Sequence, residues 1–187
     1  MTGKTILAGL VGGLVLFLWG GLAHMALPLG ELGISSVANE DPVLDAMRAN
    51  IPQSGLYFLP GMAPDKRDEN SMKVWEEKAK RGPVALIVYQ TASAGAMSPA
   101  QLGTEFASNI GVGLLAAIVL AGIGGGLAAR TGMAGLMGLM SSLDVYFSYW
   151  NWYKFPMDYT LAQIAIQVIG FVLMGAAIAA IVKKPSA

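Results

Sequence analysis

The chain has 187 residues, of which 55% are hydrophobic and only 13% charged, with 12 basic and 12 acidic side chains. Soluble domains carry about 25% charged residues, so this composition favours a membrane protein. The balanced charge argues against a nucleic-acid partner, which requires a basic surface, and the lack of cysteine excludes thiol catalysis, iron–sulfur clusters and cysteine-based zinc sites.

The first apolar run covers residues 5–27. A bilayer crossing needs about 20 residues with few charges, and this run meets that requirement. The apolar region of a signal peptide has about 7–15 residues. Because the run is longer than that, we expect an uncleaved transmembrane helix.

Residues 28–98 are predicted to form a small α/β domain outside the membrane. The predicted domains are therefore transmembrane helix 1 (residues 1–27), this outer domain, and transmembrane helices 2–4 (residues 99–187). About 70 residues bury little apolar surface, so we expect the outer domain to rest on the helix ends or on a partner protein.

Local signals predict the order helix, strand, helix, strand within the outer domain. Asp41 is predicted to cap a helix, and residues 55–59 are typical of a strand stopped by Pro-Gly. Ser71 opens a helix that runs to Arg81, and the apolar, β-branched run 84–89 is typical of a strand. Two strands joined by a helix predict parallel pairing with a right-handed crossover.

Three further apolar runs are long enough to cross the bilayer. They cover residues 106–129, 133–150 and 159–182. Ser98 followed by Pro99 is a helix-start signal, so the second transmembrane helix is predicted to begin near Pro99. The predicted fold class is membrane all-α: a bundle of four transmembrane helices with a small α/β domain inserted between helices 1 and 2.

Basic residues near the short loops indicate the orientation of this bundle. The side that contains both termini carries Lys4, Arg130, Lys183 and Lys184. Lys154 alone flanks the other short loop. The positive-inside rule then places both termini in the cytoplasm and the outer domain in the periplasm.

Aromatic residues crowd the outer end of the third and fourth predicted transmembrane helices, with Trp150, Trp152 and Tyr153 among them. Trp and Tyr are enriched at membrane–water interfaces. We therefore expect these three side chains to form part of an outer interfacial belt.

Five polar side chains are predicted to lie in the outer half of the bilayer: His24, Asn109, Asp144, Gln163 and Gln167. An ionisable group inside a membrane span is costly and is a candidate functional residue by default. The cluster is typical either of an outward-facing ligand pocket or of hydrogen-bonded helix packing. Because a buried carboxylate seeks a donor, we expect Asp144 to lie within hydrogen-bonding reach of His24 or Gln163, directly or through one water.

Several glycines are predicted to serve helix packing. Gly9, Gly13 and Gly20 share one helix face with His24, and Gly122 and Gly126 lie four residues apart. Small residues on one stripe let membrane helices approach closely. For His24 a packing role, a proton-handling or ligand-binding role, and ligation of haem or a metal all remain open. A lone histidine makes a poor metal site, so we expect no metal or cofactor. The sequence carries no catalytic motif, so we also expect no catalytic residue.

Three phrases carry a resemblance to known proteins: GLYFLPG at residues 55–61, GP at 82–83 before the apolar run 84–89, and NWYKFP at 151–156. With these phrases the chain resembles a group of uncharacterised bacterial four-helix inner-membrane proteins. The resemblance implies a four-helix protein of the bacterial inner membrane and implies no activity.

These observations favour a non-catalytic accessory or assembly subunit of a larger inner-membrane complex, with the bilayer and other membrane subunits as partners. The alternative is a binding or transport protein for a small or lipophilic ligand, such as quinone or lipid, that uses the outer polar cluster. A membrane-embedded enzyme and a haem-bearing redox subunit are further hypotheses.

Overall fold

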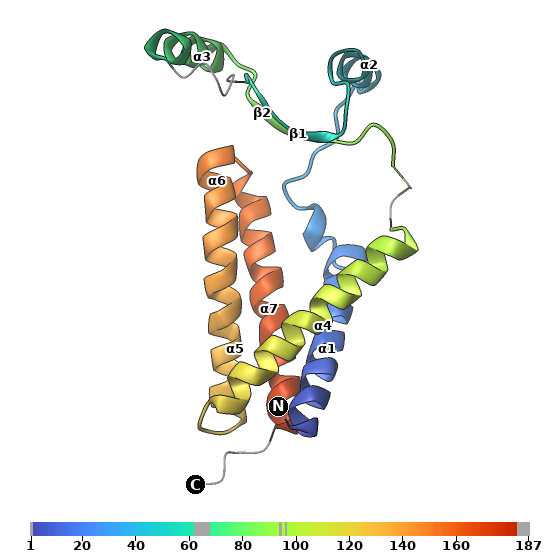
Figure 1. The fold of residues 1–187 in the computed structure, drawn as a ribbon, viewed down its shortest axis with the longest axis vertical. Coiled ribbons are helices and arrows are strands. Elements are labelled where there is room, and N and C mark those ends of the chain that lie inside the picture. The colour runs from blue at the N-terminus through green and yellow to red at the C-terminus, as the bar shows by residue number, and fades with distance from the viewer. Residues whose placement is uncertain (1, 62–67, 94, 96, 183–187) are drawn as a thin grey trace. The chain divides into compact units, whose positions relative to one another are not determined.

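The computed structural model describes residues 2–61, 68–93, 95 and 97–182 (Figure 1). The described chain is mostly helical and contains a small two-stranded sheet. It divides into two compact units. The helical unit comprises Met1–Ile34 and Met97–Ala187, and the sheet unit comprises Ser35–Ala96.

The helical unit contains three helices that are long and apolar enough to cross a membrane, and these indicate a multi-pass membrane protein. They are α1 (Gly3–Met25), α4 (Pro99–Gly122) and α7 (Met157–Ile181). Helix α4 begins where the sequence predicts, because Ser98 caps it and Gln101 completes a reciprocal capping box ahead of Pro99. A short 3-10 turn, η1 (Leu29–Glu31), follows α1.

The third predicted span, residues 133–150, is not among these three helices, so the prediction of four spans is met only in part. This region is divided between α5 (Leu127–Ser142), a π-helical turn η2 (Leu143–Phe147) and α6 (Ser148–Tyr153). The hydroxyls of Ser141 and Ser142 donate to the carbonyls of Gly138 and Leu139, both at 3.0 Å, just before the π turn. Such side-chain bonds compete with the regular α-helical ladder and favour its local distortion.

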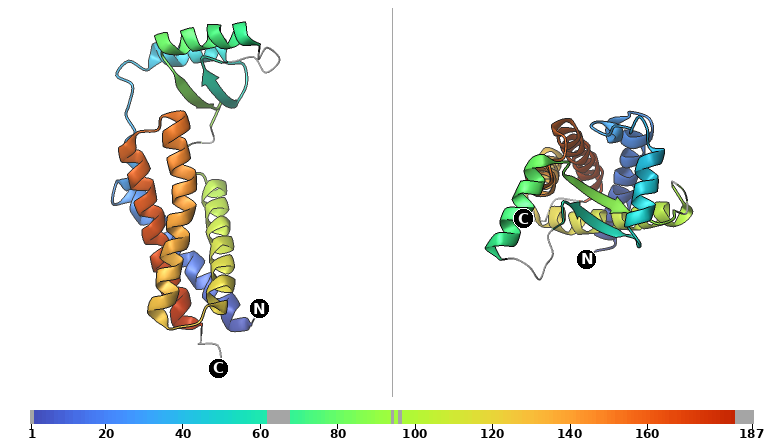
Figure 2. Two further views of the ribbon diagram at one scale, coloured as in Figure 1. Left: turned by 90° about the vertical axis from the view of Figure 1, so that its left-hand side faces the viewer. Right: turned by 90° about the horizontal axis from the view of Figure 1, so that it is seen from above.

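Small residues set the spacing of the helices in the helical unit. Helix α1 packs against α4 and α7, and α5 packs along α7 (Figures 1 and 2). At the α1–α4 crossing, Gly9, Gly13 and Gly113 lie so close that a Cβ on any of them would overlap the facing backbone. The adjoining core consists of Ala8, Ala116, Ala117, Leu120, Ala134, Phe171, Met174 and Ile178. Close van der Waals packing of this kind drives helix association in lipid.

Arg130 connects two helix ends in the helical unit. Its side chain is only 2% exposed, and its guanidinium donates to the carbonyl of Val182 at 2.7 Å and to that of Ile123 at 3.3 Å. Ile123 and Val182 are the C-caps of α4 and α7. A fixed cation is favourable at a helix C-terminus, where carbonyls lack partners and the helix dipole is negative. Arg130 therefore joins α5 to the ends of two neighbouring helices.

The sheet unit contains two helices and an antiparallel pair of strands. Its elements are α2 (Asp41–Asn50), β1 (Gly55–Leu59), α3 (Glu69–Arg81) and β2 (Ala85–Tyr89). Leu56 pairs with Val88 and Leu59 with Ala85. The predicted parallel crossover is therefore wrong. The indole of Trp75 donates to the carbonyl of Pro60 at 2.8 Å, which holds α3 next to the end of β1, so β2 starts where β1 stops.

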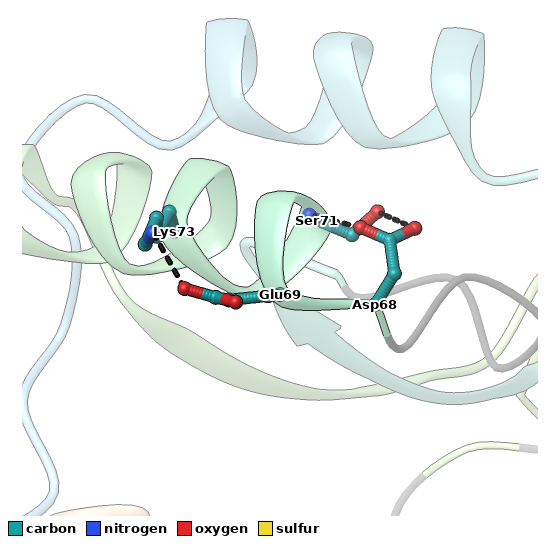
Figure 3. A network of polar contacts seen from close by, with 4 residues as sticks. All are labelled: Asp68, Glu69, Ser71 and Lys73. Atoms are coloured by element: carbon teal, nitrogen blue, oxygen red, sulfur yellow. Dashed lines mark hydrogen bonds and ion pairs between the residues drawn. The ribbon is translucent and has the colours of Figure 1, made fainter.

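Helix α3 begins two residues earlier than predicted because Asp68, rather than Ser71, is its cap (Figure 3). The Asp68 carboxylate accepts bonds from the Ser71 amide at 2.8 Å and the Ser71 hydroxyl at 3.0 Å. These bonds hold the pKa of Asp68 below its ordinary value. Lys73 pairs with Glu69 at 2.7 Å one turn along the helix. Helix α2 starts at Asp41, with Glu40 rather than Asp41 in the capping position.

Candidate functional site

A polar cavity of about 340 Å³ lies within the helical unit, between α1, α4, the π turn and α7. Its polar lining consists of His24, Glu105, Ser108, Asn109, Tyr146, Gln163 and Gln167. The apolar part of its wall includes Trp19 and Ile166. The indole of Trp19 donates to the Ile166 carbonyl at 2.8 Å, so α1 and α7 are held together at this wall.

Two glutamines from α7 give the cavity its main hydrogen-bonding capacity. Gln163 is 8% exposed and Gln167 is half-buried, and both line the cavity one helical turn apart. Neither side chain makes a hydrogen bond to any residue that the structure describes. Within the described chain, Thr131 Oγ1 is the sole fully buried side-chain polar atom without a partner. The amide atoms of Gln163 therefore reach open space, which at this position is the cavity.

Asn109 and Glu105 form the α4 wall of the cavity. The Asn109 amide nitrogen donates to the Glu105 carboxylate at 2.7 Å and to the Glu105 backbone carbonyl at 2.8 Å. Both donor hydrogens of Asn109 are thus engaged, and its side-chain oxygen is left as an acceptor. The Glu105 side chain is exposed at the rim.

His24 lies at the same rim, at the end of α1. Its Nδ1 lies 3.0 Å from the Gly20 carbonyl, an acceptor, so this bond requires the proton on Nδ1. Nε2 is then an acceptor whenever the ring is neutral. A Cβ at Gly30 would overlap the imidazole, so the glycine allows the chain after α1 to lie against His24.

Asp144 does not belong to this site. It is exposed, it is absent from the cavity lining, and it forms no hydrogen bond or ion pair with the described residues. Of the two forms of the prediction, the direct hydrogen bond from His24 or Gln163 to Asp144 is not formed. Asp144 lies in the π turn, where the regular α-helical period of about 100° per residue no longer holds. Tyr146 lines the cavity from that turn instead.

The structure thus brings together His24, Asn109, Gln163 and Gln167 and leaves out Asp144. Sequence reasoning did not identify Trp19, Ser108 and Tyr146 as lining residues. Tyr146 belongs to the aromatic-rich segment at the end of the third predicted span, and composition alone does not show which of these side chains faces a cavity. Trp19 and Ser108 carry no signal distinguishing them from ordinary helix-packing residues.

The glycines predicted to pack have different surroundings. Gly9 and Gly13 lie at the α1–α4 crossing, whereas a Cβ on Gly20, Gly122 or Gly126 would meet no atom within 4 Å. Close packing that the prediction did not include involves Gly12, Gly113, Gly138, Gly170 and Gly175. Which glycines pack closely depends on which face of each helix turns inward, and glycine spacing alone does not fix that face.

Of the residues predicted for the interfacial belt, Trp150 is 39% exposed, Trp152 73% and Tyr153 45%. Tyr149 contacts Tyr153 and Phe155 with ring centroids 6.0 and 5.2 Å apart. Aromatic packing therefore continues across the connection between α6 and α7.

No protein-family model matches this chain, and no curated protein or solved structure matches it either. Among the described residues, no group of three or more His, Asp or Glu is placed to hold a metal ion. What the lining offers is a set of neutral hydrogen-bonding groups with one carboxylate and one imidazole at the rim.

Proposed function

We propose that this chain is a multi-pass membrane protein that binds a small or lipophilic ligand in the polar cavity. The observation that carries the proposal is Gln163, which is 92% buried and has no hydrogen-bond partner in the described chain although it lines the cavity. The amide atoms of Gln163 are not themselves fully buried, so they are open to the cavity and free to bond a molecule there. A typical hydrogen bond contributes about 0.5–1.5 kcal/mol. Glutamines that serve helix packing normally bond across helices. Gln163 and Gln167 do not, and a bound ligand that accepts and donates hydrogen bonds would satisfy both.

The experiment is extraction and mass spectrometry of molecules that co-purify with the full chain in a mild detergent. We expect one compound to be enriched with the wild-type protein and to be depleted about tenfold from the Gln163→Leu, Gln167→Leu double variant, because two hydrogen bonds are lost. Gln90→Leu is the matched control, since Gln90 is an exposed residue of the sheet unit. Equal recovery from all three proteins would remove the support for a binding function.

We further propose that the helical run from Leu127 to Tyr153 crosses the membrane as a fourth span, in agreement with the resemblance to four-helix bacterial inner-membrane proteins. Support comes from its packing along α7 and from Leu136 and Met140, which are 60% and 71% exposed in the single chain and suit contact with lipid. Both termini would then be cytoplasmic and the sheet unit periplasmic.

Cysteine labelling tests this topology. A cysteine at Asn70 should react with an impermeant reagent in intact spheroplasts, whereas one at Ser186 should react only after lysis. The reverse pattern would show that the proposed orientation is wrong.

A second candidate function is that of an accessory or assembly subunit of a larger membrane complex. The observation that favours it is the thin core of the sheet unit, in which none of the described residues is fully buried. Leu56 and Val88, which face each other across the two strands, are 68% and 75% exposed. A protein partner covering this pair would supply the missing burial. Stable co-purification of one partner at equal amounts, lost on Leu56→Asp, is the result that this function predicts.

A further inference from the structure

An apolar groove adjoins the polar cavity on the α1–α4 side of the helical unit. It has a volume of about 670 Å³ and is lined by α1 between Phe17 and Met25, by the first turns of α4, and by Met97. Gly20, His24 and Glu105 line both the groove and the polar cavity. The two spaces therefore meet at these three residues.

The chemistry of the wall changes across this shared rim. On the cavity side, Asn109, Gln163 and Gln167 present amide groups. On the groove side the lining is hydrocarbon, with Leu22 and Leu102 48% and 45% exposed. Glycines keep the groove open, because a Cβ on Gly20 or Gly21 would meet no atom within 4 Å. A ligand that occupies both spaces must have a polar head and an apolar chain.

The lining also restricts the charge of the head. Among the described residues, neither space has a lysine or arginine in its wall. Proteins recognise phosphate and carboxylate groups chiefly through these side chains. The one lining carboxylate, Glu105, is exposed and already accepts a bond from Asn109, so it is not a buried counter-charge for a cationic head. A charged head beside Gln163 would lose its hydration without gaining a counter-charge.

From the meeting of these two spaces, we infer that the ligand is an uncharged amphiphile. Its carbonyl or hydroxyl head bonds to Gln163 and Gln167, and its hydrocarbon chain lies in the α1–α4 groove. The inference rests on the proposed binding function and adds the chemical class of the ligand. A quinone and a neutral glycerolipid share this chemistry, and the test below separates them.

The test uses the full chain in detergent and four probes. Two are quinones with the same dimethoxy-methyl-benzoquinone head, one without a chain and one with a decyl chain. The third is dioctanoylglycerol, and the fourth is dioctanoyl phosphatidylglycerol, which has a charged head. Binding is followed by the fluorescence of Trp19, which lines the cavity, with the Trp19→Phe variant supplying the background signal.

The Gly21→Leu variant distinguishes binding of the ligand's hydrocarbon chain from binding of its polar head. Gly21 lines the groove but not the polar cavity, and the position has room for a side chain. We expect this variant to weaken binding of the decyl quinone at least about fivefold, since several buried methylene groups are displaced. Binding of the chainless quinone should change by less than about twofold. Gln163→Leu should weaken the binding of both quinones at least about fivefold. Gly111→Leu, at another open glycine that lines neither space, should change neither.

Saturable binding of dioctanoylglycerol in place of the quinones, with the same response to Gly21→Leu, would identify a neutral lipid as the source. Preference for phosphatidylglycerol, or no saturable binding of any uncharged probe, would overturn the uncharged class. If both quinones bind and depend on Gln163 but ignore Gly21→Leu, the chain assignment is wrong and the binding function stands. If they bind without regard to Gln163→Leu, both the inference and the proposed function fail.

Discussion

Arg130→Ala should destabilise the helical unit more than any other single loss of charge in the described chain. The side chain is 2% exposed and donates to the carbonyls of Val182 and Ile123 at 2.7 and 3.3 Å. Hydrogen bonds to a charged group contribute about 1.5–3 kcal/mol each. Counting the two donors to Ile123 as one bond, the loss of both bonds amounts to about 3–6 kcal/mol.

The assay is equilibrium unfolding in mixed micelles of mild detergent and SDS, followed by circular dichroism of the helices. Arg130→Lys should recover part of the loss, because an ammonium is a point charge and does not bridge two carbonyls as a guanidinium does. Arg81→Ala is the control, since Arg81 is exposed at the end of α3 and its loss should change the unfolding free energy by less than about 0.5 kcal/mol. An Arg130→Ala protein as stable as the Arg81→Ala protein would refute the assignment of Arg130 as a clamp between helix ends.

Three further predictions concern packing, an unpaired hydroxyl and pH. Gly113→Leu should disrupt the α1–α4 crossing and lower the unfolding free energy by at least about 2 kcal/mol, whereas Gly111→Leu, on an open face of the same helix, should cost less than about 1 kcal/mol in the same assay. Thr131→Val should raise stability by about 1 kcal/mol because it removes a buried hydroxyl without a partner, and a loss of similar size would contradict this account. The lowered pKa of Asp68 means that its cap stabilises α3 above the ordinary carboxyl pKa and is lost as pH falls through the lowered value. Hydrogen exchange at the Ser71 amide should therefore lose protection on acidification in the wild type and be weakly protected at all pH values in Asp68→Ala.

Much of the helical architecture could be predicted from the sequence because lipid imposes long apolar runs on spanning helices. Helices α1, α4 and α7 satisfy that rule, and Ser98 marks the start of α4 through local chemistry alone. The antiparallel pairing of β1 and β2 was not predicted because it depends on where α3 is held. That position is set by the bond from Trp75 to Pro60, a tertiary contact that no sequence period reveals.

The candidate site could also be predicted only in part, because the sequence gives the depth of a side chain in the membrane but not its direction. Counting residues from helix ends gives the depth of a side chain, and His24, Asn109, Gln163 and Gln167 do line one cavity. Direction requires the helical period to hold. It fails at the π turn, so Asp144 points elsewhere and Tyr146 takes a place in the cavity wall.

Ligand binding in the polar cavity depends most directly on the side-chain amide of Gln163. Selective ¹⁵N labelling of glutamine allows its NH₂ resonances to be observed in detergent, with Gln163→Leu providing the assignment. Addition of the compound extracted from the wild-type protein to stripped protein should move the Gln163 and Gln167 amide signals and slow their exchange with water, because the amides gain hydrogen-bond partners. Unchanged Gln163 resonances at saturating compound would contradict a ligand site in the polar cavity.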